Sequence, residues 1–247
     1  MLKAIFFDLD GTLVDDNDSI RVALSQACQA VSERWPTLDP DDLGIIYRQF
    51  SDTAWSNYDR YLRHLVSPEA MLASVWQRTL ATRGVNDPYA ARLASEIYWT
   101  YRLQHCHLYA DVLPLLQELT VRFTLCMLTN GAPTMQRAKV TATRLGPFFH
   151  HVFVGGDFTR GKPDAPIFDA ALAAAQCQPS EAIHIGDSLT HDIAGARGVG
   201  VHSVWLNRKG FRLQDLASDN AAAPDFAITT LADLPECLGT IPNKMGK

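Results

Sequence analysis

Two aspartates separated by one residue interrupt an apolar run near the start of the chain. The run begins at Ala4, and Asp8 and Asp10 precede Gly11 and Thr12. A short apolar segment bounded by a turn signal is typical of a buried strand in a parallel sheet. Positions i and i+2 of a strand share a face, so both carboxylates are predicted to point the same way at its carboxyl end. Carboxylates this close repel each other, and Mg²⁺, which prefers oxygen ligands, would remove that conflict.

Further polar residues follow later apolar runs, each where a predicted strand ends or a predicted helix begins. Thr129-Asn130-Gly131 offers a hydroxyl, an amide and backbone N–H groups at a helix start, and such groups favour the binding of an anion. Lys162, before another predicted helix, can place a positive charge beside the same anion. Asp187 ends a fourth strand and could complete a metal site with Asp8. Asp192, near the next helix start, could bind a metal-bound water or hold Lys162.

Strands and helices alternate over most of the chain. Apolar runs closed by Gly, Asn, Asp or Ser predict strands, and apolar or alanine-rich faces at helical spacing predict helices. The predicted strands after the first are 123–128, 151–154, 182–185, 201–206 and 226–228, and the helices between them are 111–120, 133–145, 166–175 and 192–198. This alternation predicts an α/β fold, a Rossmann-like doubly wound parallel sheet with helices on both faces.

The segment 15–107 departs from this alternation, because it contains helical patterns and no convincing strand. The predicted helices are 19–34, 41–50, a stretch around 55–65, 68–82 and 88–107. We therefore expect residues 1–14 and 108–247 to form the α/β catalytic core and residues 15–107 to form a smaller, inserted helical cap domain. Since the insertion directly follows the first strand, it is predicted to act as a lid that excludes water and contacts the substrate.

The composition is typical of a globular protein. The 247 residues are 47% hydrophobic and 20% charged, with a net charge of −5, which argues against nucleic acid polymers and anionic membranes as partners. No apolar run approaches the roughly 20 residues of a transmembrane helix, and the first strand begins too early for a signal peptide. The five scattered cysteines form no CxxC pair, so we expect a cytoplasmic protein with reduced thiols. Its oligomeric state is not predicted.

The four polar groups, in this order at strand ends, resemble the four motifs of the haloacid dehalogenase (HAD) superfamily. The resemblance covers nearly the whole chain, and the helical insertion lies where that family has its C1 cap. Residues 128–131, 154–156, 161–163 and 205–207 look most like the N-acylneuraminate-9-phosphatase and pyrimidine 5′-nucleotidase branch.

This resemblance implies roles for the three aspartates nearest the proposed metal. Asp8 would be the nucleophile that attacks phosphorus to form an aspartyl-phosphate. Asp10 would protonate the leaving alcohol and then activate the water that hydrolyses the intermediate. Asp8, the backbone carbonyl of Asp10, and Asp187 would hold Mg²⁺, with waters completing an octahedron.

The resemblance also implies how the phosphate would be bound. Thr129, the backbone N–H of Asn130, and Lys162 would contact the phosphate oxygens. Lys162 would also serve catalysis, because attack by a carboxylate on an anionic phosphate needs cations to offset repulsion. Asp192 would act indirectly, through Lys162 or a metal-bound water. Each residue alone has an ordinary structural explanation: Thr129 as a helix cap, Lys162 as a surface lysine and Asp192 as an N-cap.

The implied activity is that of a Mg²⁺-dependent phosphatase acting on a small phosphorylated metabolite, such as a nucleotide or sugar phosphate. Asp10 favours phosphate chemistry, since haloacid dehalogenases have no acid at this position because a halide needs no proton. A sugar phosphomutase, a haloacid dehalogenase and a non-catalytic binding protein on the same fold are the alternatives. Substrate choice is expected to depend on the helical insertion, although its aromatic residues are more often the core of a helical bundle than substrate contacts.

Overall fold

The computed structural model describes residues 1–57, 66–211 and 223–241. The chain divides into two compact units. The sheet unit comprises Met1–Asp15, Leu108–Gln136 and Thr143–Lys247, and the helical unit comprises Asp16–His107 and Arg137–Ala142. The short segment Arg137–Ala142, which the sequence places in the α/β core, therefore belongs with the helical unit.

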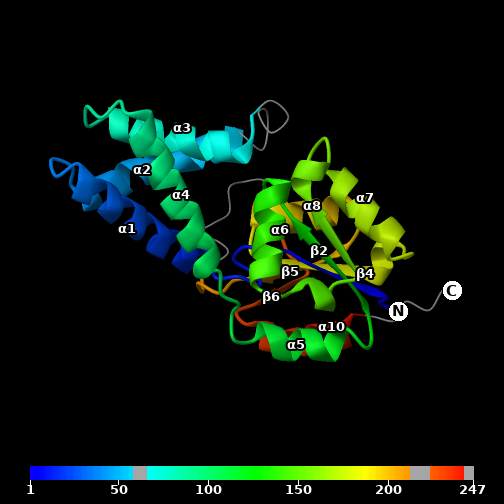
Figure 1. Cartoon of the computed structure of the whole chain (residues 1–247). Helices are drawn as coiled ribbons and strands as arrows, with labels where there is room; N and C mark the ends of the chain where they lie inside the picture. The colour runs from blue at the N-terminus through cyan, green and yellow to red at the C-terminus, as the bar shows by residue number, and fades with distance from the viewer. Residues whose placement is uncertain (58–65, 212–222, 242–247) are drawn as a thin grey trace. The chain divides into compact units, whose positions relative to one another are not determined.

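The sheet unit is built on six strands in the order β3-β2-β1-β4-β5-β6, and every neighbouring pair is parallel (Figure 1). The strands are β1 (Ala4–Phe7), β2 (Thr124–Thr129), β3 (His151–Val154), β4 (Ala182–Gly186), β5 (His202–Leu206) and β6 (Phe226–Ile228). β1 lies between β2 and β4, where the strand order reverses. In such sheets ligands bind beyond the carboxyl ends of the strands at this reversal point.

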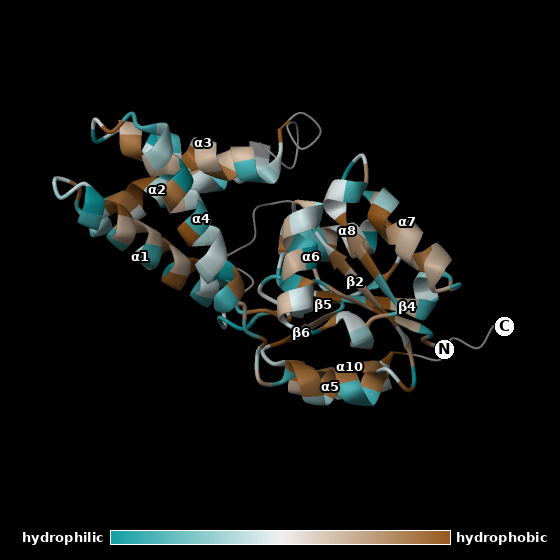
Figure 2. Ribbon diagram, viewed as in Figure 1, coloured by the Kyte–Doolittle hydropathy of each residue, from teal (hydrophilic) through white to brown (hydrophobic). Residues whose placement is uncertain are grey.

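Helices cover both faces of the sheet, with α7 and α8 on one side and α5 and α10 on the other (Figure 1). The helices of this unit are α5 (Val112–Leu119), α7 (Ala165–Ala174), α8 (Ala194–Gly198) and α10 (Leu234–Thr240); α6 (Pro133–Ala142) begins here and ends in the helical unit. The strands are predominantly hydrophobic (Figure 2), because a parallel sheet buries both faces. On one face, Phe168 of α7 packs with Phe6 and Leu128 of the strands. The predicted doubly wound α/β fold is confirmed.

The helical unit contains α1 (Asp16–Arg34), α2 (Pro40–Asn57), α3 (Pro68–Ala81) and α4 (Pro88–Gln104). Separate helices were predicted at 41–50 and around 55–65, but the chain forms one helix, α2, up to Asn57. The rest of the second prediction, residues 58–65, lies outside the described residues. Aromatic rings form the centre of the unit. The centre of the Tyr47 ring lies 4.4 Å from the centre of the Trp76 ring and 5.2 Å from the centre of the Tyr98 ring. All three side chains are buried, so Trp76 and Tyr98 serve the bundle core.

A buried ion cluster ties Arg137–Ala142 to the helical unit. The Oδ1 atom of Asp16, the first residue of α1, accepts hydrogen bonds from Arg102 Nη2 at 2.6 Å and from Lys139 Nζ at 3.0 Å. Burial favours the protonated form of Asp16, but the two cations outweigh it and hold the pKa of this carboxyl well below its usual range. Lys139 is thereby bound to the start of α1, although it follows β2 in sequence.

Two further features concern the state of the cysteines and the apolar content of the helices. None of the five cysteines, all in the described part, forms a disulfide. Across residues 1–57, 66–211 and 223–241, no helix has both the length and the apolar content needed to cross a membrane.

We predict that Trp76→Ala destabilises the protein strongly. Trp76 is fully buried among aromatic rings, and truncation of a buried tryptophan typically costs about 3–5 kcal/mol through lost contacts and a cavity. Urea unfolding followed by circular dichroism measures the change. Ile45→Ala is the control: Ile45 is 60% exposed on α2 of the same unit, and its change should stay within about 0.5 kcal/mol. Equal effects would contradict the assigned core.

Candidate active site

The centre of the candidate site is a buried lysine held between two buried carboxylates. Lys162 Nζ lies 2.6 Å from Asp8 Oδ1 and 2.6 Å from Asp192 Oδ1, and it donates to the carbonyl of Leu128 at 2.7 Å. Lys162 is only 5% exposed, so it is not a solvated surface lysine. The loops that follow β1, β3 and β4 bring these residues together from distant parts of the chain.

Asp192 is fully engaged by its neighbours. Besides Lys162, its Oδ1 atom has His184 Nε2 at 2.9 Å, and its Oδ2 atom accepts from the backbone N–H of Ser188 at 3.0 Å. Asp192 is not a helix N-cap, since Ser188 caps the π-helical turn Leu189–Ile193 in which Asp192 lies. The structure therefore brings Asp192 to Lys162, one of the two positions considered for it from the sequence.

Two glycines allow the carboxylates to approach the backbone. A Cβ atom on Gly11 would overlap the carboxylate of Asp187, and Gly11 also has φ of +80°, which favours glycine. A Cβ atom on Gly186 would overlap the carboxyl group of Asp192. Both positions therefore require glycine for the carboxylates to lie where they do.

The cluster combines three carboxyl groups with one ammonium group. Burial raises the pKa of Asp8 well above its usual value, and repulsion from Asp192 and Asp187 adds to this against the effect of Lys162. Burial, with Asp192 next in size, raises the pKa of Asp187 to about 7. Burial also favours neutral Lys162, but Asp192 and Asp8 outweigh it and raise its pKa above the usual range. Asp8 and Asp192 contact the ammonium group, Asp187 is more exposed, and a bound cation would favour the ionised forms of Asp8 and Asp187.

The donor set fits a hard divalent cation. Asp8, Asp187 and Asp192 each offer an oxygen atom, and these atoms lie within 4.8 Å of one another. Both oxygens of Asp192 already accept hydrogen bonds. The carboxylates best suited to a metal are therefore those of Asp8 and Asp187, and carboxylate oxygens are ligands that Mg²⁺ prefers.

Asp10 lies close enough to this cluster for its charge to contribute to the raised pKa of Asp187. β1 ends at Phe7, so strand alternation does not extend to Asp8 and Asp10, and the two carboxylates have different partners. Asp10 Oδ2 accepts a hydrogen bond of 2.8 Å from Gln136 Nε2, which also donates to Thr129 Oγ1 at 2.6 Å. Gln136 was not predicted from the sequence, where it has no feature that sets it apart from other polar residues of a helix.

The side chain of Asn130 binds the backbone of Lys162, which its position after a strand did not predict. Its Nδ2 atom donates to the carbonyl of Lys162 at 2.9 Å, and its Oδ1 atom accepts from the Lys162 backbone N–H at 2.8 Å. This pair of hydrogen bonds fixes the backbone from which the buried ammonium group extends. Gly161 and Gly155 leave room for it, because a Cβ atom on either would collide with the Asn130 amide.

Arg208 supports the loop after β1 from another direction. Its Nη2 atom donates to the carbonyl of Thr12 at 3.0 Å, and its guanidinium group forms a two-pronged ion pair with Asp111 at 2.9 Å. The guanidinium carbon also lies 3.8 Å from the centre of the Tyr109 ring. Arg208 was not predicted from the sequence, because it is 196 residues from Thr12.

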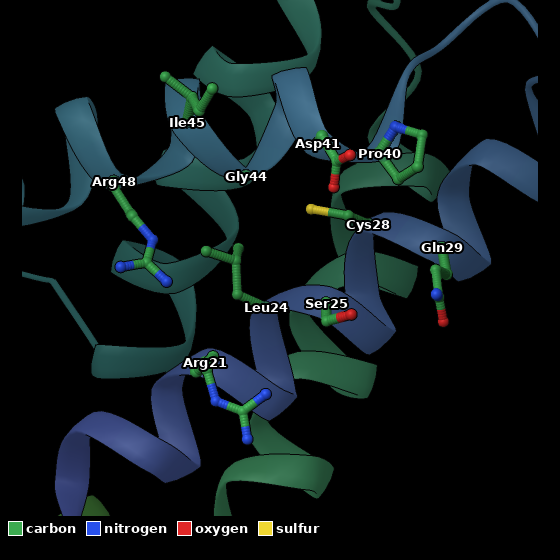
Figure 3. Close-up of a pocket in the computed structure, with 10 residues that line it drawn as sticks. All are labelled: Arg21, Leu24, Ser25, Cys28, Gln29, Pro40, Asp41, Gly44, Ile45 and Arg48. Carbon is green, nitrogen blue, oxygen red and sulfur yellow. The ribbon is translucent and has the colours of Figure 1, made fainter.

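A separate hollow of about 260 Å³ lies within the helical unit between α1 and α2 (Figure 3). Leu24 and Cys28 contribute to its lining, with Arg21 and Arg48 from the two helices. Its single carboxylate is Asp41, so this hollow lacks the paired carboxylates and buried lysine of the candidate site.

We predict that Lys162→Met destabilises the fold strongly, because it leaves Asp8 and Asp192 buried without their cation. Breaking a buried pair from one side typically costs about 3–5 kcal/mol. Urea unfolding at neutral pH, without added metal, measures the loss. Lys3→Met is the matched control, since the Lys3–Glu181 pair is a surface contact with 56% of the lysine side chain exposed, and such pairs contribute little. Similar losses in both variants would refute the account of the buried lysine.

Comparisons with known proteins place this chain in a family. Residues 2–200 match the family model for haloacid dehalogenase-like hydrolases. The chain is 27% identical to N-acylneuraminate-9-phosphatase of Homo sapiens, an alignment that covers 99% of this chain and 96% of the relative. It is 30% identical to glyceraldehyde 3-phosphate phosphatase of Pyrococcus furiosus, over 96% of this chain and 93% of the relative.

A solved structure shows the same relationship. The 2-haloacid dehalogenase of Pseudomonas syringae pv. Tomato matches with a TM-score of 0.70 and 31% identity, covering 97% of this chain and 99% of that one. The resemblance expected from the four motifs is thus confirmed, and with it the expectation of an enzyme. The chain belongs to the haloacid dehalogenase-like hydrolase family.

Proposed function

We propose that this protein is a Mg²⁺-dependent phosphatase that hydrolyses small phosphate monoesters through an aspartyl-phosphate at Asp8. The observation that carries the proposal is the contact of 2.6 Å between Asp8 and the buried ammonium group of Lys162, beside the carboxylate of Asp187. The names of two relatives that match nearly the whole chain, both phosphatases, support this activity.

In the first step, a carboxylate oxygen of Asp8 attacks phosphorus while the bond from phosphorus to the ester oxygen breaks. Lys162 offsets the repulsion between the carboxylate and the phosphoryl group. Thr129 and the backbone N–H of Asn130 bind the remaining phosphoryl oxygens. Asp8, the carbonyl of Asp10, and Asp187 would hold Mg²⁺, which would supply further positive charge beside the phosphoryl group.

Asp10 carries the proton in both steps. It first donates a proton to the leaving oxygen, so that the departing group is an alcohol. In the second step Asp10 removes a proton from water, whose oxygen attacks phosphorus and releases the carboxylate of Asp8. The products are the alcohol and inorganic phosphate.

The names of the relatives indicate the class of substrate. The named relatives act, by their names, on an N-acylneuraminate 9-phosphate and on glyceraldehyde 3-phosphate, so we propose a small phosphorylated metabolite, such as a sugar phosphate or nucleotide. Residues 1–14 and 108–247 form the catalytic core in this proposal, and residues 15–107 act as the cap that excludes water and selects the substrate.

A dehalogenase is the second candidate, because the chain is 31% identical to a protein named 2-haloacid dehalogenase. Asp10 argues against it, since loss of a halide requires no proton donor. Incubation with 2-chloropropionate separates the candidates: chloride release would favour the dehalogenase, and phosphate release from a phosphate ester favours the phosphatase. Isomerisation of a sugar 1-phosphate would instead indicate a phosphomutase.

We predict that Asp8→Asn lowers turnover of 4-nitrophenyl phosphate by a factor on the order of 10³ or more, because the amide is a poor nucleophile. Release of 4-nitrophenol measures the rate, and circular dichroism verifies the fold. Asp18→Asn is the matched control; Asp18 pairs with Arg21 at the surface of α1, and its replacement should leave activity unchanged. Activity near that of the wild type in Asp8→Asn would disprove the assigned nucleophile.

We predict that chelation of divalent cations abolishes phosphatase activity and that Mg²⁺ restores it. The reason is the excess of carboxylates around Asp8 and Asp187. Asp187→Asn should raise the Mg²⁺ concentration needed for half-maximal activity, since it removes one charged ligand. Full activity of protein shown by elemental analysis to contain no metal would contradict the metal requirement.

A further inference from the structure

Gln136 joins two residues of the proposed mechanism and has no assigned function in it. It is the fourth residue of α6 (Pro133–Ala142), and it is only 4% exposed. Its Nε2 atom donates to Asp10 Oδ2 at 2.8 Å and to Thr129 Oγ1 at 2.6 Å. One buried amide group thus holds the proposed proton carrier and a proposed phosphate ligand together.

The direction of these hydrogen bonds follows from the chemistry of the partners. An ionised carboxylate only accepts hydrogen bonds, whereas the amide nitrogen of glutamine has two N–H donors. The nitrogen of Gln136 must therefore face Asp10. The hydrogen bond to Oδ2 fixes the orientation of the Asp10 carboxyl group.

The same reasoning orients the hydroxyl of Thr129. Its oxygen accepts from Gln136, so its own hydrogen is directed elsewhere. The hydroxyl has the carbonyl of Asn130 at 3.3 Å, a long contact for an O–H donor. A phosphoryl oxygen, as a charged acceptor, would form a shorter and stronger bond with this hydroxyl.

The neutrality of Gln136 matters for Asp10. A lysine or arginine in this place would put a full positive charge beside the carboxyl group, whereas a carboxamide orients it through a hydrogen bond without adding charge. A buried amide is costly unless its donors are satisfied, so the two contacts also keep Gln136 itself in place.

We propose that Gln136 is the positioning residue for Asp10, and that it holds the carboxyl group in the orientation needed for proton transfer to the leaving oxygen. This inference rests on the proposed phosphatase function and deepens it. It implies that the loss of Gln136 impairs proton transfer to the leaving group more than it impairs attack by Asp8.

The test compares leaving groups in Gln136→Met, which keeps an unbranched side chain of similar length without hydrogen-bond donors. For alkyl phosphates, whose leaving alcohols need a proton, kcat/KM should fall roughly 10- to 100-fold, part of the 10²–10⁴-fold that general acid catalysis supplies. For 4-nitrophenyl phosphate, which needs little protonation, kcat/KM should fall less than about 3-fold. The comparison uses kcat/KM, which reports the steps through attack by Asp8, because Asp10 also serves the later hydrolysis that both esters share.

Two further variants complete the experiment. Gln136→Asn keeps the amide but not its reach, should show the same selective loss, and serves as the test if the methionine variant does not fold. Gln117→Leu, at an exposed position of α5, is the control and should leave both activities unchanged. Equal losses for both kinds of ester, or no loss, would overturn the proposal. Absence of turnover by the wild type would overturn the proposed function itself, and this inference with it.

Discussion

The arrangement of the candidate site depends on one buried contact, the ammonium group of Lys162 between the carboxylates of Asp8 and Asp192. Each N–O distance is 2.6 Å, and all three side chains are buried. Without this cation, two negative charges would face each other away from water, which is strongly unfavourable. The contact joins the loops after β1, β3 and β4, so the sheet and the charge cluster stabilise each other.

The residues around this contact hold the backbone of the loops that carry it, and they add no further charge to the contact itself. The amide of Asn130 holds the backbone of Lys162 through two hydrogen bonds. Gly11 and Gly186 let carboxylates lie against the chain. Arg208 holds the carbonyl of Thr12. The parallel sheet supplies the frame, since its strand ends meet at one edge.

The sequence was sufficient for features that depend on local pattern. All six strands follow from apolar runs closed by turn residues, and Asp8, Lys162 and Asp192 follow from their positions at the ends of these elements. Contacts between distant segments could not be predicted in this way. Gln136 looks like any polar residue on a helix, and only the fold brings it to Asp10. The break predicted between the helices at 41–50 and around 55–65 was wrong as far as Asn57, because no local signal showed that α2 continues to this residue.

The central claim is that Asp8 becomes phosphorylated during turnover. The most direct measurement is borohydride reduction of protein quenched with denaturant during steady turnover of a phosphate ester with Mg²⁺, followed by peptide mass spectrometry. Reduction of an aspartyl-phosphate converts that aspartate to homoserine, so the account predicts homoserine at position 8, absent when substrate is omitted. Homoserine at another aspartate, or its absence from protein that is turning over substrate, would contradict the account.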